Sequence, residues 1–167
     1  MTQNSPTDSR VAWVGLDQSY SGFGIAELNS NGDSATDLWK FPPTGEDGQR
    51  LGAIYVRLVT LFMQFQETYD EVHVAMEGYA MGRTFNREKL GELGGVVKLA
   101  HNTVFGTDPL VVPPTSLKKF ITGKGNASKK EIVKAVQDRW DSSVKNDNVA
   151  DAYGLACYIK EQKSATI

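Results

Sequence analysis

The order of hydrophobic patterns along the chain limits its possible folds more than any other feature. Three short strand-like segments come first, at residues 10–17, 22–28 and 36–41. Helical spacing then alternates with strand spacing: helices are predicted at 48–67, 88–105, 115–121, after Ser128 and at 147–161, and strands at 71–77 and 109–112. Antiparallel strands followed by alternating strands and helices predict an α/β fold, a mixed five-stranded sheet flanked by helices in the order β-β-β-α-β-α-β-α-α.

The length of 167 residues is typical of one domain, which we place at residues 10–162. The polar ends, 1–9 and 163–167, are predicted to be disordered tails. The single cysteine excludes an intramolecular disulfide framework, and no apolar run is long enough to span a membrane. These observations predict a cytoplasmic protein with no membrane partner.

Charge is distributed unevenly along the chain, although the formal net charge is only −2. Residues 1–77 hold 4 basic and 11 acidic side chains, whereas residues 78–140 hold 11 basic and 5 acidic ones. Such segregation favours an acidic site beside a basic surface.

Acidic side chains follow two predicted strands and begin the last predicted helix. Asp17 ends the first strand and Glu77 ends the fourth, and the helix carries Asp147, Asn148 and Asp151 near its start. Strand ends are where sites collect in α/β sheets, and residues three or four apart share one face of a helix. Several converging carboxylates repel one another unless cations neutralise them, and Mg²⁺ prefers oxygen ligands. The pattern therefore predicts a pair of Mg²⁺ ions, replaceable by Mn²⁺, of the kind that hydrolyses phosphodiesters.

Each acid also has an ordinary structural interpretation. A lone Asp after a strand is most often a turn former or a helix cap, and acids on a solvated helix face are common. The joint occurrence of these acids favours the site.

Five segments of the sequence carry a resemblance to a known family. They are GLDQSYSGFGIA (15–26), VAMEGY (74–79), LGELGGVVKLA (90–100), LKKFITGKGNASKKEI (117–132) and DNVADAYGLA (147–156). In order and spacing they resemble the RuvC-type Holliday-junction resolvases, in particular the phage-type members. The resemblance covers about 140 residues and implies the RNase H-like nuclease fold.

The resemblance implies roles for individual residues. Asp17, Glu77 and Asp151 match the family's metal-binding acids. The family's remaining helical ligand corresponds to Asn148, a departure because an amide brings an oxygen but no charge; Asp147 is the alternative. Lys118 matches a DNA-binding lysine, and Lys129 matches a lysine near the scissile phosphate.

Basic and aromatic side chains indicate where DNA would lie. Residues 115–134 contain six lysines and one acid, and Lys124 stands between two glycines that leave backbone amides free for phosphates. The loop 78–87 interleaves aromatic and arginine side chains, which suits stacking on unpaired bases, although its aromatics are equally compatible with core packing. The predicted DNA-binding residues are Tyr79, Arg83, Phe85, Arg87, Lys118, Lys119, Lys124 and Lys130.

Three glycines, Gly91, Gly94 and Gly95, lie inside a predicted helix, where each costs about 1 kcal/mol relative to Ala. They predict a close approach of two backbones, either within one subunit or, as the resemblance implies, at a two-fold dimer interface.

Together, these features predict a homodimeric, Mg²⁺-dependent endonuclease that resolves Holliday junctions or related branched DNA in a bacterial or phage-infected cytoplasm. The alternatives are an RNase H-like nuclease for flaps or hybrids, and a junction-binding protein with a weakened metal site.

Overall fold

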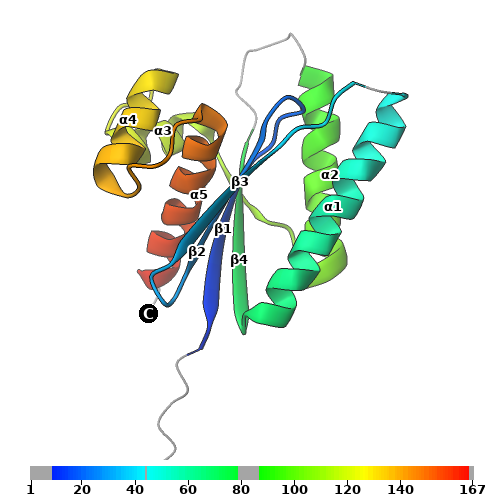
Figure 1. Cartoon of the computed structure of the whole chain (residues 1–167), viewed down its shortest axis with the longest axis horizontal. Coiled ribbons are helices and arrows are strands. Elements are labelled where there is room, and N and C mark those ends of the chain that lie inside the picture. Colours follow the sequence, from blue (N-terminus) through cyan, green and yellow to red (C-terminus); the bar gives the residue numbers. More distant parts are fainter. Residues whose placement is uncertain (1–8, 44, 79–86, 166–167) are drawn as a thin grey trace, which may run out of the picture.

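A five-stranded sheet forms the centre of the molecule, with helices on both faces (Figure 1). The computed structural model describes residues 9–43, 45–78 and 87–165. The strands are β1 (Val11–Asp17), β2 (Phe23–Asn29), β3 (Ser34–Trp39), β4 (Glu71–Glu77) and β5 (Leu110–Val112). The helices are α1 (Asp47–Thr68), α2 (Arg87–Phe105), α3 (Pro114–Thr122), α4 (Lys129–Arg139) and α5 (Asp147–Ser164).

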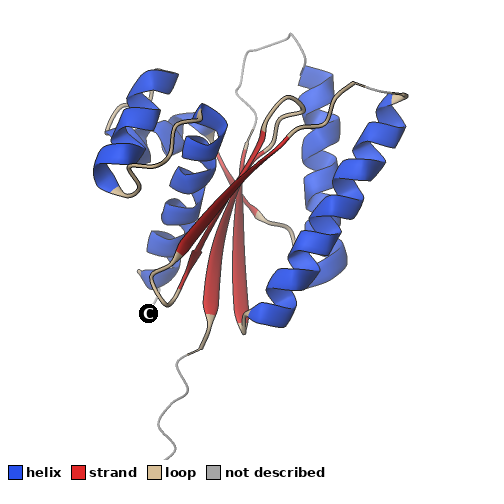
Figure 2. Cartoon of the chain, in the orientation of Figure 1, coloured by secondary structure: helices blue, strands red, loops and turns tan. Residues whose placement is uncertain are grey.

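The sheet is mixed, as the sequence predicts. Its strand order is β3-β2-β1-β4-β5, in which β1–β2 and β2–β3 are antiparallel and β1–β4 and β4–β5 are parallel (Figure 2). The central strand β1 therefore has an antiparallel neighbour on one side and a parallel neighbour on the other. Asp17 and Glu77 end two adjacent parallel strands at the same edge of the sheet.

Alternation along β1 divides the core into two layers. Ala12, Val14 and Leu16 are fully buried and pack in the cluster that contains side chains of α1 and α2. The opposite face of the sheet packs against α5, with α3 and α4 beyond it (Figure 1). Because side chains alternate between faces, Gly15 and Asp17 belong to the α5 face.

Two glycines allow α5 to lie directly on the sheet. A Cβ atom added to Gly15 would lie 1.9 Å from the carbonyl oxygen of Ala152, and one added to Gly24 would lie 2.2 Å from that of Asn148. Both are backbone contacts, which no side-chain movement can relieve. The absence of a side chain at these positions sets the distance between α5 and the sheet.

Among the described residues, two of the three α2 glycines do not show the predicted close approach within the chain. Added Cβ atoms at Gly91 and Gly95 would meet nothing within 4 Å in the described part of the molecule, whereas Gly94 is buried. The close backbone contacts occur instead at Gly15 and Gly24, on strands.

The predicted elements are all present, with differences at their ends. Three helices follow β5, in agreement with the helices predicted at 115–121, after Ser128 and at 147–161, whereas the abbreviated predicted order counts only two. The last helix continues to Ser164 rather than ending at Glu161, because no glycine or proline interrupts its polar end. The predicted capping box is confirmed: Ser128 accepts from the backbone N–H of Glu131, whose side chain accepts from that of Ser128.

Candidate active site

Asp17 and Glu77 lie side by side at one edge of the sheet. The preceding residues, Leu16 and Met76, are register partners in the parallel β1–β4 pair. A side-chain hydrogen bond with Asp17 lowers the pKa of Glu77, and the negative charge of Glu77 raises the pKa of Asp17. The two carboxyl groups are therefore close enough to shift each other's pKa.

The start of α5 brings two further acids to the same place. Asn146 caps the helix, and its side chain accepts from the backbone N–H groups of Asn148 and Val149 at 2.9 and 3.2 Å. The cap fixes where the helix begins, and Asp147 and Asp151 are one turn apart on it. Both raise the pKa of Asp17 through their negative charge, so the helix acids act on the strand acids as the sequence predicts.

Burial makes this cluster electrostatically costly. Asp17 is only 7% exposed, and its pKa lies well above the ordinary value, first because of desolvation and then because of Glu77 and Asp151. Desolvation, followed by the charge of Asp151, raises the pKa of Glu77 to about 7. Desolvation and then Asp147 raise the pKa of Asp151 to about 6. At neutral pH the cluster therefore favours protons or cations over free charges.

Two lysines partly offset this negative charge. The Nζ atom of Lys129, the first residue of α4, lies 2.5 Å from Oδ2 of Asp147. This hydrogen bond lowers the pKa of Asp147 and raises that of Lys129. Lys118 on α3 lowers the pKa of both Glu77 and Asp151 by its charge. The structure thus brings both predicted lysines to the acids.

Asn148 and Asp147 differ in what their side chains contact. A Cβ atom added to Gly22 would lie 2.5 Å from Nδ2 of Asn148, so this amide lies against the turn that follows β1. Asp147 is engaged by Lys129. Both side chains therefore have a neighbour in this arrangement.

The donor set fits a hard divalent cation by its chemistry. Buried carboxylates with raised pKa values are the groups that such an ion stabilises in the charged form. In the described ranges, however, no group of three or more His, Cys, Asp or Glu side chains is arranged to hold one ion.

Gln18 is a member of the site that the sequence analysis did not identify. It is 8% exposed, and its Nε2 donates to the backbone oxygen of Glu77 at 2.5 Å. Its Oε1 is buried without a hydrogen-bond partner among the described residues. The sequence does contain a signal for Gln18, because it is a polar residue directly after a buried strand and beside an acid.

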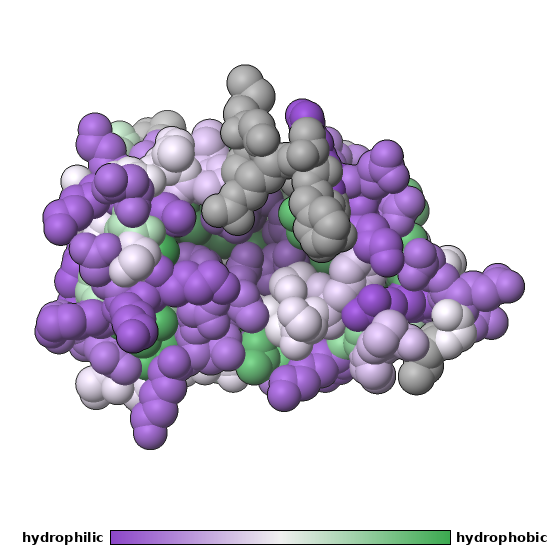
Figure 3. Space-filling model, turned by 90° about the horizontal axis from the view of Figure 1, so that it is seen from above, coloured by the Kyte–Doolittle hydropathy of each residue, from purple (hydrophilic) through white to green (hydrophobic). Residues whose placement is uncertain are grey.

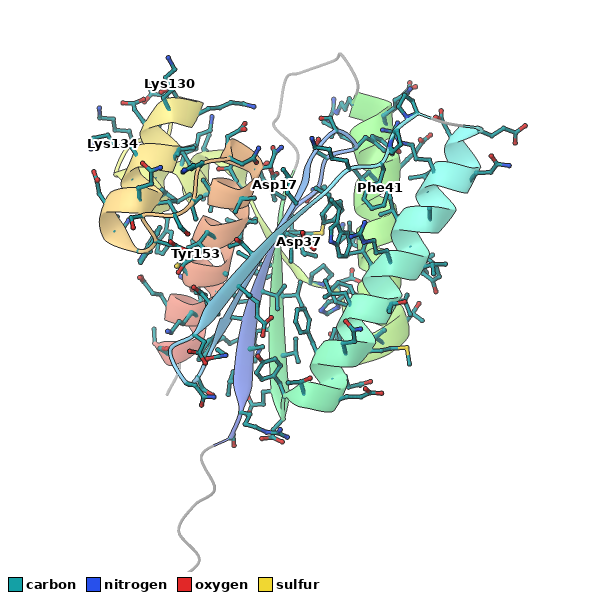
Figure 4. The ribbon with its side chains drawn as sticks, viewed as in Figure 1. Asp17, Asp37, Phe41, Lys130, Lys134 and Tyr153 are labelled. Atoms are coloured by element: carbon teal, nitrogen blue, oxygen red, sulfur yellow. The ribbon has the colours of Figure 1, made fainter. Side chains whose placement is uncertain are left out.

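The remaining predicted DNA-binding residues lie around this end of the molecule. Lys119, Lys124 and Lys130 are exposed on α3, α4 and the turn between them, and Lys124 pairs with Glu131 at 3.3 Å. Figure 4 shows Lys130 on the α4 side of Asp17. Arg87 is exposed at the start of α2. Tyr79, Arg83 and Phe85 lie outside the described residues.

Seen from above, the end of the sheet that carries the acids lies between two hydrophilic regions. Figure 3 shows hydrophilic side chains over the α3–α4 side and over the start of α1. Within the described ranges, no helix has the length and apolar character needed to cross a membrane.

Comparison with solved structures shows which known fold this is. The chain is similar to Thermus thermophilus RuvC in complex with a Holliday junction substrate, with a TM-score of 0.71 and 20% identity over 93% of this chain and 96% of that chain. A second Thermus thermophilus RuvC structure gives a TM-score of 0.67 and 21% identity over the same shares. No protein-family model matches the sequence. The predicted fold, that of RuvC, is therefore confirmed.

Proposed function

We propose that the protein is a divalent-metal-dependent endonuclease that resolves Holliday junctions or related branched DNA. The observation that carries the proposal is the buried group of Asp17, Glu77 and Asp151 at the sheet edge. It occurs on a fold shared with a RuvC that was solved in complex with a Holliday junction substrate.

Asp17, Glu77 and Asp151 would hold two Mg²⁺ ions, for which Mn²⁺ substitutes, with Asn148 or Asp147 as a further ligand. When bound, the metal ions supply an activated water and stabilise the leaving oxygen. Burial raises the pKa of Asp17 and of Glu77, and a cation binds the charged form of each carboxyl group, so metal binding near neutral pH would release protons.

Lys129 would hold the scissile phosphate. Its ion pair with Asp147 places a cation at the edge of the acid cluster, where an incoming phosphate would otherwise be repelled. Lys118 has the same electrostatic effect on Glu77 and Asp151. The exposed Lys119, Lys124, Lys130 and Arg87 would bind the DNA backbone, and Tyr79, Arg83 and Phe85 are proposed to contact bases near the branch point.

A homodimer would present two such sites to one junction. Large apolar side chains are exposed on the outer faces of α1 and α2: Val56 is 62% exposed, Met63 50% and Leu99 58%. An added Cβ atom at Gly95 would meet nothing within 4 Å among the described residues, which would let a second helix approach α2 closely. Two acid clusters related by two-fold symmetry would permit paired cuts in opposed strands. This activity would take place where DNA is accessible, in the cytoplasm of a bacterium or of a phage-infected host.

The test is cleavage of a synthetic four-way junction in Mg²⁺, with a linear duplex, a flap and an RNA–DNA hybrid of the same sequence as comparison substrates. We expect paired cuts in the junction, loss of cleavage in EDTA, and loss of cleavage in Asp17→Asn. Faster cleavage of the flap or hybrid would favour the alternative nuclease. Full activity of Asp17→Asn would refute the site.

A second candidate is a junction-binding protein without effective cleavage. Asn148 lacks the charge of a carboxylate, and no three ligands in the described residues converge on one ion position. This candidate predicts tight junction binding without cleavage in Mg²⁺ or Mn²⁺, unchanged in Asn148→Asp.

A further inference from the structure

Three of the four basic residues in the acidic first half of the chain lie in one part of the molecule. Residues 1–77 contain only four, Arg10, Lys40, Arg50 and Arg57. Arg10 pairs with Asp70 at 3.4 Å, at the start of β1. The other three lie at the end of β3 and on α1.

Two of these cations rest on aromatic rings. The Arg50 guanidinium carbon lies 4.0 Å from the centre of the Tyr20 ring, and that of Arg57 lies 4.1 Å from the Trp39 ring and 5.9 Å from the Phe41 ring. We call Tyr20, Trp39, Phe41, Arg50 and Arg57 the arginine–aromatic corner. Stacking holds a guanidinium in place, so less rotamer freedom is lost when it binds a ligand.

Within the described ranges, neither guanidinium has a carboxylate partner. In the described residues no Asp or Glu oxygen lies within ion-pair distance of Arg50 or Arg57. The Nε atom of Arg50 is buried and has no hydrogen-bond partner in the part of the chain that the structure describes.

Acids on the neighbouring elements make other contacts or act on Tyr20. Asp37 accepts from the indole Nε1 of Trp39 at 2.6 Å, and Glu46 takes part in the capping box of α1. Asp47 and Glu92 act on the Tyr20 hydroxyl, whose pKa is raised mainly by burial. Both cations of the corner thus remain available for an anion.

The corner lies at the same end of the sheet as the acid cluster. Trp39 pairs with Phe23 in the β2–β3 register, and Gly24, the next residue, pairs with Asp17. The backbone N–H of Phe41 donates to the carbonyl oxygen of Tyr20, three residues after Asp17, at 3.1 Å. Figure 4 shows Phe41 on the α1 side of Asp17, opposite Lys130.

We propose that the arginine–aromatic corner is a second DNA-backbone site, which binds phosphates on the α1 side of the acid cluster. The inference rests on the proposed function and extends it. The lysines of α3 and α4 contact the substrate on one side of Asp17, and Arg50 and Arg57 contact it on the other. The planar guanidinium binds a phosphate through two parallel hydrogen bonds, which suits a fixed backbone contact.

The alternative is that both arginines only cover core aromatics, and the salt dependence of binding separates the two. Each phosphate contact contributes about −0.9 to the slope of log K against log[salt]. We expect Arg50→Gln and Arg57→Gln each to make the slope shallower by about 0.9 for a four-way junction in EDTA. The affinity advantage of the wild type should therefore shrink about threefold between 50 and 200 mM salt.

Matched variants provide the controls. Arg50→Lys keeps the charge and should keep the wild-type slope. A packing defect would instead change the slope of Arg50→Lys and of Arg50→Gln alike. Arg10→Gln removes a cation at the opposite end of the sheet and should leave the slope unchanged. Arg57 is exposed, so its replacement keeps the test valid if Arg50→Gln does not fold.

The outcomes are distinguishable. If the wild type binds the junction and both glutamine variants keep its slope, the corner is refuted and the proposed function stands. If the wild type does not bind the junction, the proposed function fails and the corner fails with it.

Discussion

Replacing Glu77 by Gln should stabilise the protein at high pH while removing its proposed activity. The folded state raises the pKa of Glu77 from 4.5 to about 7, mainly by burial and then by the charge of Asp151. Between these two values the folded chain holds a proton that the unfolded chain releases. The free energy of unfolding therefore falls as pH rises through this window.

The size of this effect follows from the shift. A difference of about 2.5 pKa units corresponds to roughly 3 kcal/mol that the wild type loses above pH 7. Gln carries no charge at any pH, and its amide can still hydrogen-bond with Asp17. We expect Glu77→Gln to be about 1–3 kcal/mol more stable than the wild type at pH 8 in EDTA, and equally stable near pH 4.5. For a chain of this length the gain is roughly 2–10 °C in Tm.

Denaturant unfolding of the wild type and Glu77→Gln at both pH values, in EDTA and in Mg²⁺, measures this difference in stability. Glu67→Gln, on the exposed face of α1, is the control and should show no pH-dependent gain. Mg²⁺ should stabilise only the wild type, by about 3 kcal/mol at one hundred times its Kd. A variant no more stable than the wild type at pH 8, or equally stabilised at both pH values, would refute the reasoning.

Three further substitutions test how the site is held. Gln18→Leu should lower the free energy of unfolding by about 1–3 kcal/mol in urea, because the backbone oxygen of Glu77 loses its donor; an unchanged midpoint would contradict this. Gly15→Ala should cost at least about 1–3 kcal/mol and reduce cleavage, since its Cβ would force α5 away at Ala152; a wild-type Tm would show that α5 adapts freely. Ser128→Ala should cost about 1 kcal/mol by removing the α4 cap, read from thermal unfolding, and a loss of several times that size would indicate a role beyond capping.

Local signals account for how well the elements were predicted. The strand β4 ends at Glu77 as its alternation predicts, and α4 begins after Ser128 because the capping box is contained in four consecutive residues. The end of α5 was missed because its last turn carries no stop signal. Element type depends on neighbours a few positions away, so the sequence is sufficient for it.

The candidate acids were predictable for a similar reason, and their environment was not. An acid directly after a buried strand stands out in any α/β sequence, and this identified Asp17 and Glu77. The hydrogen bond between them depends on β1 and β4 being neighbours in the sheet. Register partners on these strands, such as Val11 and Glu71, are 60 positions apart in the sequence. Gln18 escaped notice because its partner is a backbone oxygen on that distant strand.

The amino-acid order by itself determined the sequence of helices and strands, the acids at the strand ends and the lysine-rich segment. Only the tertiary structure decided that Gly15 and Gly24 bring α5 onto the sheet, that burial raises the pKa of Glu77, and that Arg50 rests on Tyr20 beside the acids. The reason is that patterns report local preference, whereas desolvation and close contact depend on residues distant in the chain. The charge of a segment, summed along the sequence, placed the basic surface only at 78–140. Folding also places Arg50 and Arg57, which come from the acidic half of the sequence, over the rings of Tyr20 and Trp39.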